Sequence, residues 1–150
     1  MESLVDIARR SLELWTRHDI DAYMDLFHED AVYSGPGRVS RGHDAFRKHM
    51  EIYAEAFPSE RLTFIRGTQV GDDVAMLQFR VEGQHLGVMR WSNSRQIPPT
   101  GRSYRLDCVT VFHFKDRKIV LLEDFYDLYD MLFKQLAWPF PQRRAETASD

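Results

Sequence analysis

Two apolar runs in the C-terminal third, separated by a short charged connector, constrain the fold more than any other stretch. The runs are Leu106–Phe114 and Ile119–Tyr126, and both are rich in β-branched and aromatic residues. The connector, Lys115–Lys118, is polar and very short, and this combination favours an antiparallel β-hairpin. The chain is therefore expected to contain an antiparallel sheet that includes these two strands.

The second run carries acidic residues where an ordinary core strand would be apolar. Strand alternation places Asp124 on one face with Leu122, and Glu123 on the opposite face. A carboxyl group among apolar side chains costs free energy unless it is paired, hydrogen-bonded or protonated. The pattern indicates either the acid of a pocket or a strand edge that faces water, and alternation alone leaves open which acid faces inward.

The N-terminal part of the chain predicts three helices. Apolar residues recur at helical spacing from Ser3, which opens a capping-box arrangement, to Trp15. Asp19 can cap a short second helix, and a third helix is expected from about Asp44 to Phe57. Between the second and third helices we expect only a brief extended piece over residues 31–33 and a turn over residues 34–37.

The remainder of the chain predicts strands and one last helix. Leu62–Val70 and Val74–Leu86 are expected strands, while Met89–Gln96 is equally compatible with an arm, a strand extension or a loop. After the hairpin, Asp127 can cap an amphipathic helix. Helices followed by antiparallel strands predict an α+β fold, in which three N-terminal helices cover one face of a curved, mostly antiparallel sheet.

Composition limits the kind of protein this can be. We expect one domain over residues 1–141 and a polar, disordered tail over residues 142–150. A net charge of −3 without a basic stripe argues against nucleic-acid binding, and no apolar run reaches membrane-spanning length. The histidines lack metal-ligand spacing, so no metal is expected. The single cysteine, Cys108, and the absence of a signal-peptide pattern predict a cytoplasmic protein.

Short motifs follow one another through the chain in a recognisable order. They are Trp15–Asp21, Leu26–Tyr33, Arg41–Phe46, Ala56–Pro58, Gly83–Gly87, Ile97–Arg102 and Val111–Val120. Their order and spacing resemble those of the SnoaL-like polyketide cyclases, within the nuclear transport factor 2-like superfamily. The resemblance covers roughly residues 4 to 136 and implies a cone-shaped α+β domain with an internal apolar pocket.

The resemblance also implies a chemistry. SnoaL-like cyclases close a ring by aldol condensation without a metal or organic cofactor, and their acid/base aspartate falls on Asp124. A histidine of the characterised cyclases falls on Thr110, so this chain keeps the acid and lacks the histidine. In the related ketosteroid isomerases the base would lie near Gly35 and the oxyanion-hole acid near Thr110. Neither carboxyl group is present here, which disfavours a ketosteroid isomerase.

The candidate site residues follow from these two lines of reasoning. The catalytic candidates are Asp124 as acid/base, with His85 or Thr110 holding the carbonyl oxygen. Each has a structural alternative: a surface carboxylate for Asp124, a hydrogen-bonded strand histidine for His85 and an ordinary strand threonine for Thr110. The candidate substrate contacts, which could equally be core or surface residues, are Tyr33, Tyr53, Arg80, Phe112 and Tyr126.

The sequence therefore predicts a SnoaL-like polyketide cyclase-type enzyme without a cofactor. It would perform acid/base chemistry on a small apolar or aromatic carbonyl compound, by cyclisation or by a related isomerisation, lyase reaction or hydrolysis. The alternative is a non-catalytic small-molecule-binding or dimerisation module of the same fold. The resemblance also implies a homodimer.

Overall fold

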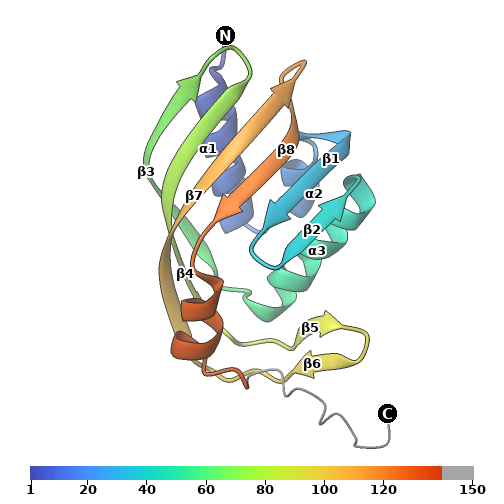
Figure 1. Ribbon diagram of the computed structural model, residues 1–150, viewed down its shortest axis with the longest axis vertical. Coiled ribbons are helices and arrows are strands. Elements are labelled where there is room, and N and C mark those ends of the chain that lie inside the picture. Colours follow the sequence, from blue (N-terminus) through green and yellow to red (C-terminus); the bar gives the residue numbers. More distant parts are fainter. Residues whose placement is uncertain (140–150) are drawn as a thin grey trace, which may run out of the picture.

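The structure is a computed structural model, and it describes residues 1–139. The predicted boundary at residue 141 and the predicted disorder of residues 142–150 lie outside the described residues. Two helices come first, two strands and a third helix follow, and six more strands lead to a π-helical segment η1 at the end (Figure 1). The elements are α1 Leu4–Thr16, α2 Ile20–Met24, β1 Phe27–Gly35, β2 Arg38–Arg41, α3 His43–Ala56, β3 Arg61–Val70, β4 Val74–Gln84, β5 Met89–Ser92, β6 Arg95–Ile97, β7 Ser103–Lys115, β8 Lys118–Phe125 and η1 Asp130–Gln135.

A curved, open six-stranded sheet forms one layer of the domain. Its strand order is β2-β1-β8-β7-β4-β3, and every neighbouring pair is antiparallel except the parallel pair β1 and β8. The helices lie on one face of this sheet (Figure 1). Helix α1 packs on β3 and β4, α3 packs on β1 and β2, and α2 lies between α1 and α3. The predicted α+β class, with helices on one face of a mostly antiparallel sheet, is confirmed.

The predicted hairpin is the β7–β8 pair. Asp116 and Arg117 at its tip have φ values of 50° and 64°, the left-handed conformation that a type I′ hairpin turn requires at both central residues. A register shift between His113 and Phe114 interrupts the ladder. This bulge breaks the alternation, so Ile119 is fully buried although strict alternation would put it on the face opposite buried Leu122.

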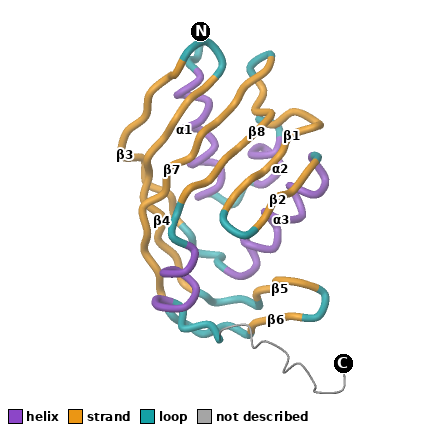
Figure 2. The backbone as a smooth tube through the Cα atoms, in the orientation of Figure 1, coloured by secondary structure: helices purple, strands orange, loops and turns teal. Residues whose placement is uncertain are grey.

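Some elements differ from the sequence expectations. The predicted turn after β1 exists, but a further strand, β2, follows it and pairs with β1. The one buried residue of this short edge strand is the polar Ser40, and its apolar residue Val39 is 54% exposed, so the strand gives no apolar pattern. The ambiguous stretch Met89–Gln96 forms the separate hairpin β5–β6, below the main sheet in Figure 2. Asp127 accepts a hydrogen bond from the backbone N–H of Asp130, as expected of a cap, although the segment that follows is a π-helix.

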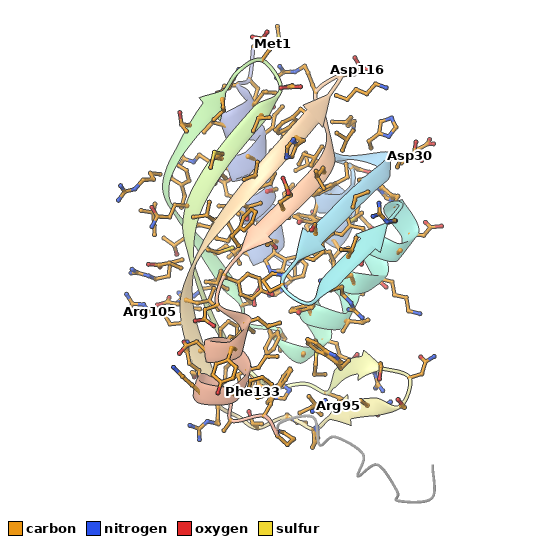
Figure 3. The ribbon with its side chains drawn as sticks, in the orientation of Figure 1. Met1, Asp30, Arg95, Arg105, Asp116 and Phe133 are labelled. Atoms are coloured by element: carbon orange, nitrogen blue, oxygen red, sulfur yellow. The ribbon has the colours of Figure 1, made fainter. Side chains whose placement is uncertain are left out.

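The core between the layers is aromatic at its centre. Phe46 on α3 is fully buried, and its ring centroid lies 4.6 Å from that of Phe27 and 5.6 Å from that of Tyr33, both on β1. Side chains from both layers fill most of the space between the sheet and the helices (Figure 3). Within residues 1–139, no helix is long and apolar enough to cross a membrane.

Candidate functional site

A cavity of about 100 Å³ lies between the sheet and helices α1 and α3. Its wall is made mainly of aromatic and aliphatic side chains, and two carboxyl groups interrupt it, those of Asp124 and Glu60. Six of the eight residues that the sequence nominated line this one cavity. They are Asp124, Thr110, Tyr33, Tyr53, Phe112 and Tyr126.

The ladder between β7 and β8 fixes the position of Asp124. Thr110 and Asp124 are direct partners in this ladder, and the Thr110 hydroxyl donates a hydrogen bond of 2.5 Å to Oδ1 of Asp124. The Tyr33 hydroxyl, from β1 on the other side of β8, also hydrogen-bonds this carboxyl. Burial raises the pKa of Asp124 from 3.8 to about 6, and these two hydrogen bonds hold it from rising further. Asp124 is therefore a carboxyl that can change charge near neutral pH.

Tyrosine hydroxyls and one histidine complete this side of the cavity. Tyr53 and Tyr126 hydrogen-bond each other through their hydroxyls, and burial raises the pKa of both phenols, so both stay neutral. The His49 ring is stacked on that of Tyr53, with centroids 4.9 Å apart, and lies against Tyr33. Burial and the charge of Arg38 lower the pKa of His49 to about 3. Arg38 can only donate, so Nδ1 of His49 is the acceptor of its 3.4 Å contact and the imidazole proton is on Nε2.

Glu60 is the residue at this cavity that the sequence reasoning missed. It lies in the connection between α3 and β3, where an acid after Pro58 and Ser59 would ordinarily be exposed, yet it is 8% exposed. The indole N–H of Trp15 donates to Oε1 at 2.7 Å, and the Tyr104 hydroxyl donates to Oε2. Burial, and to a lesser extent the charge of Asp124, raise the pKa of Glu60 to about 7. Both donors are more than 40 residues away in sequence, so no local sequence pattern predicts that Glu60 is buried.

The structure does not bring His85 to the cavity wall. Its side chain is fully buried beyond the end of β4, and Nδ1 accepts hydrogen bonds from the backbone N–H of Thr100 at 3.1 Å and from the indole N–H of Trp138 at 3.2 Å. The His85 ring also packs against those of Phe57 and Trp138. Through these contacts His85 connects the turn before β7, at Thr100, to Trp138 near the C-terminal end of the described residues. No chemical role follows from them.

Arg80 also lies away from the cavity. Its neighbours Phe79 and Val81 line the cavity, so strand alternation directs Arg80 to the other face of the sheet. There its Nε donates a 3.2 Å hydrogen bond to Asp107 on β7. Both side chains are more than one third exposed, so this is a surface ion pair and no contact with a substrate follows from it.

The described residues offer no cluster of ligands for a metal ion. Across residues 1–139, no three His, Cys, Asp or Glu side chains are grouped as a metal site requires. The thiol of Cys108 faces the cavity, but burial raises its pKa, which makes it a poor nucleophile. The groups that can exchange protons near neutral pH at this cavity are therefore the two carboxyls.

Comparisons with known proteins agree on one family and one fold. A family model described as "SnoaL-like domain" matches residues 8–122. A structure from Pseudomonas putida KT2440, provisionally described as a polyketide cyclase, is 22% identical with a TM-score of 0.77, over 89% of this chain and 98% of that one. A second structure with the same provisional description, from Xanthomonas campestris pv. campestris, is 19% identical with a TM-score of 0.76, over 89% and 96% of the two chains.

A third solved structure was determined with a bound small molecule. It is a hypothetical protein with a ketosteroid isomerase-like fold from Catenulispora acidiphila DSM 44928, in complex with trimethylamine. It is 16% identical with a TM-score of 0.72, over 89% of this chain and 94% of that one. At these identities the solved structures show the fold alone. A search of functionally curated protein sequences found no significant match.

Proposed function

Because the chain belongs to the SnoaL-like domain family, we propose that it is an enzyme that moves protons on a small apolar carbonyl compound and needs no cofactor to do so. The observation that carries this proposal is the Asp124 carboxyl. It lies in an apolar cavity, is held by the hydroxyls of Thr110 and Tyr33, and has its pKa raised to about 6. A general base is most effective when its pKa lies near the working pH.

In this proposal Asp124 acts as a carboxylate at pH values above about 6. It takes a proton from the carbon next to a substrate carbonyl, and the resulting enol can attack a second carbonyl to close a ring or take up a proton elsewhere. Thr110 and Tyr33 orient the carboxylate toward the substrate. His85 and Arg80 have no part in this chemistry, since neither lines the cavity.

The size of the cavity restricts the substrate. A volume of about 100 Å³ is smaller than the roughly 150 Å³ of an engineered apolar cavity that holds benzene. The compound that enters is therefore no larger than a single benzene ring, or the cavity widens to admit it. A small 1,3-dicarbonyl compound suits the weak base, because its central C–H is flanked by two carbonyls, and it enters if the cavity widens.

Deuterium exchange into such a compound tests the proposal directly. We expect the protein in D₂O to accelerate loss of the C3 proton signal of 3-methyl-2,4-pentanedione in proton NMR, relative to buffer of the same pH. The acceleration should rise with pH through about 6, as Asp124 ionises. The proposal is overturned if exchange proceeds at the buffer rate at every pH from about 5 to about 8, a range that spans the pKa of Asp124.

Substituting Thr110 probes the role of its hydroxyl. Thr110→Val removes the hydrogen bond that holds the Asp124 pKa down. A hydrogen bond to a charged group is worth about 1.5–3 kcal/mol, so we expect the acidic limb of the exchange profile to move up by roughly one to two pH units. Thr68→Val, at an exposed position of β3, is the matched control and should leave the profile unchanged. An unshifted limb in Thr110→Val would assign the hydroxyl a structural role.

A second candidate is a module that binds a small molecule without transforming it. The feature that favours it is a cavity with two carboxyl groups and many aromatic rings, and with no Lys or Arg side chain from residues 1–139 in its wall, which suits a small amine. The related structure with trimethylamine gives this candidate a chemical precedent. A protein that only binds a small molecule would bind trimethylamine and would leave the diketone exchange at the buffer rate.

The homodimer expected from the family resemblance stays a prediction.

A further inference from the structure

Two carboxyl groups from different parts of the fold meet at one cavity. Asp124 comes from β8, and Glu60 comes from the connection between α3 and β3. The charges of both carboxyls act on the same three side chains of the wall, Tyr23, Tyr53 and Cys108. A substrate in the cavity would therefore be within reach of either group, yet Asp124 alone leaves the substrate oxygen without an acid.

The partners of Glu60 decide where its proton resides. The indole N–H of Trp15 can only donate, so Oε1 of Glu60 is always an acceptor. The carbonyl oxygen of a carboxylic acid accepts better than its hydroxyl oxygen, so the proton of neutral Glu60 is on Oε2, the oxygen that contacts the Tyr104 hydroxyl. A hydroxyl both donates and accepts, so it can accept the proton of Oε2 and turn its own hydrogen toward the cavity, which Tyr104 also lines.

Resting on the proposed function above, we propose that Glu60 and Tyr104 form the acid half of the site and deliver a proton to the substrate carbonyl oxygen. The Asp124 carboxylate takes the proton from carbon, and the C–H electron pair becomes the carbon–carbon double bond of the enol. The carbonyl π pair moves to oxygen, which takes the hydroxyl proton of Tyr104 while Oε2 of Glu60 returns one to Tyr104. Asp124 ends protonated and Glu60 ends as a carboxylate, so charge and protons balance.

The ionisation behaviour of the cavity is consistent with this division. Burial raises the pKa of Asp124 to about 6 and that of Glu60 to about 7, so between these values the carboxylate at Asp124 and the neutral acid at Glu60 coexist. The other groups facing the cavity keep one charge state near neutral pH. Raised pKa values keep the phenols and the thiol neutral, and a lowered pKa keeps His49 neutral. The groups with raised pKa values are Tyr23, Tyr33, Tyr53, Cys108 and Tyr126.

Glu60→Gln tests the inference while preserving the hydrogen bonds. The amide oxygen can accept from Trp15 and the amide N–H can donate to Tyr104, but no proton can be transferred. We expect exchange of 3-methyl-2,4-pentanedione to slow by about 10²-fold, the lower end of the range for loss of a general acid. The rate is measured at about pH 6.5, roughly midway between the pKa values of Asp124 and Glu60. The decline of the wild-type rate above about pH 7 should disappear, because it reports ionisation of Glu60.

Two further variants and one spectroscopic measurement make the outcome decisive. Tyr104→Phe keeps Glu60 but removes the relay, and should slow exchange by a similar factor; Glu13→Gln, exposed on α1, should leave it unchanged. The wild type should show a protonated-carboxyl infrared band that titrates near pH 7, and in Glu60→Gln this band should be lost, while the band of Asp124, which titrates near pH 6, remains. Normal wild-type exchange with an unaltered rate and profile in Glu60→Gln overturns this inference alone. Wild-type exchange at the buffer rate overturns the proposed function and this inference together.

Discussion

Replacing Asp124 with asparagine is expected to abolish catalysed exchange and, at pH 8, to make the fold more stable. Asparagine has nearly the same shape and can still accept a hydrogen bond from Thr110 or Tyr33, but it cannot take a proton. We expect the exchange rate to fall by about 10³-fold or to the buffer rate, within the range of about 10²–10⁴ for a lost general base. This is the largest loss of activity that we expect from any single substitution in the cavity.

The gain in stability follows from the direction of the pKa change. The pKa of Asp124 is higher in the folded chain than its ordinary value of 3.8, so ionisation costs folding free energy. The cost is absent below pH 3.8 and complete above the folded value of about 6. A rise of this size corresponds to on the order of 3 kcal/mol. Removing the charge should therefore raise the free energy of unfolding at pH 8 and leave it nearly unchanged at pH 4, to within about 0.5 kcal/mol.

Urea denaturation at the two pH values measures this effect. Asp30→Asn is the matched control, because the Asp30 side chain is 94% exposed and its loss should change stability by less than about 0.5 kcal/mol at either pH. A variant that is less stable than the wild type at pH 8 would contradict the raised pKa and place a stabilising ion pair at Asp124. The expected result, higher stability with lost activity, is the exchange of stability for function that buried active-site charges impose.

The sequence predicted the Asp124 side of the cavity because that side obeys local rules. The hairpin signal pairs the two runs, alternation puts Thr110 and Leu122 on the inner face, and the resemblance selects Asp124 over Glu123. In the structure Glu123 is on the outer face, 2.6 Å from Nε2 of His113. The same alternation places Arg80 on the outer face, because its neighbours Phe79 and Val81 are apolar and are buried in the structure.

The Glu60 side of the cavity could not be predicted, because it is assembled entirely by long-range contacts. Nothing near Glu60 in sequence distinguishes it from an exposed loop acid, and its two donors come from α1 and β7. His85 illustrates the converse limit. The motif Gly83–Gly87 drew attention to His85, but it could not show that N–H groups of Thr100 and Trp138 already donate hydrogen bonds to Nδ1 of this histidine. Short edge strands such as β2 and the bulge that buries Ile119 depend on pairing geometry, which residue patterns do not record.

Phe46→Ala is expected to cause the largest loss of stability. Phe46 is fully buried, and its ring meets Phe27 edge-on at 4.6 Å and lies 5.6 Å from Tyr33. Truncating a buried phenylalanine removes its transfer free energy and leaves a cavity, so we expect a cost of about 3–5 kcal/mol. A domain of this size has a total stability of roughly 5–15 kcal/mol, so the variant should unfold at a much lower urea concentration.

The same substitution links the core to the site. Tyr33 rests against Phe46 on one side and donates a hydrogen bond to Asp124 on the other, so a cavity beside its ring loosens the hydroxyl that lowers the Asp124 pKa. We therefore expect the acidic limb of the exchange profile to move to higher pH in the fraction of Phe46→Ala that stays folded. Val39→Ala, at a position 54% exposed on β2, is the control and should change stability by less than about 0.5 kcal/mol. A loss of stability in Phe46→Ala with an unmoved acidic limb would show that Phe46 does not position Tyr33.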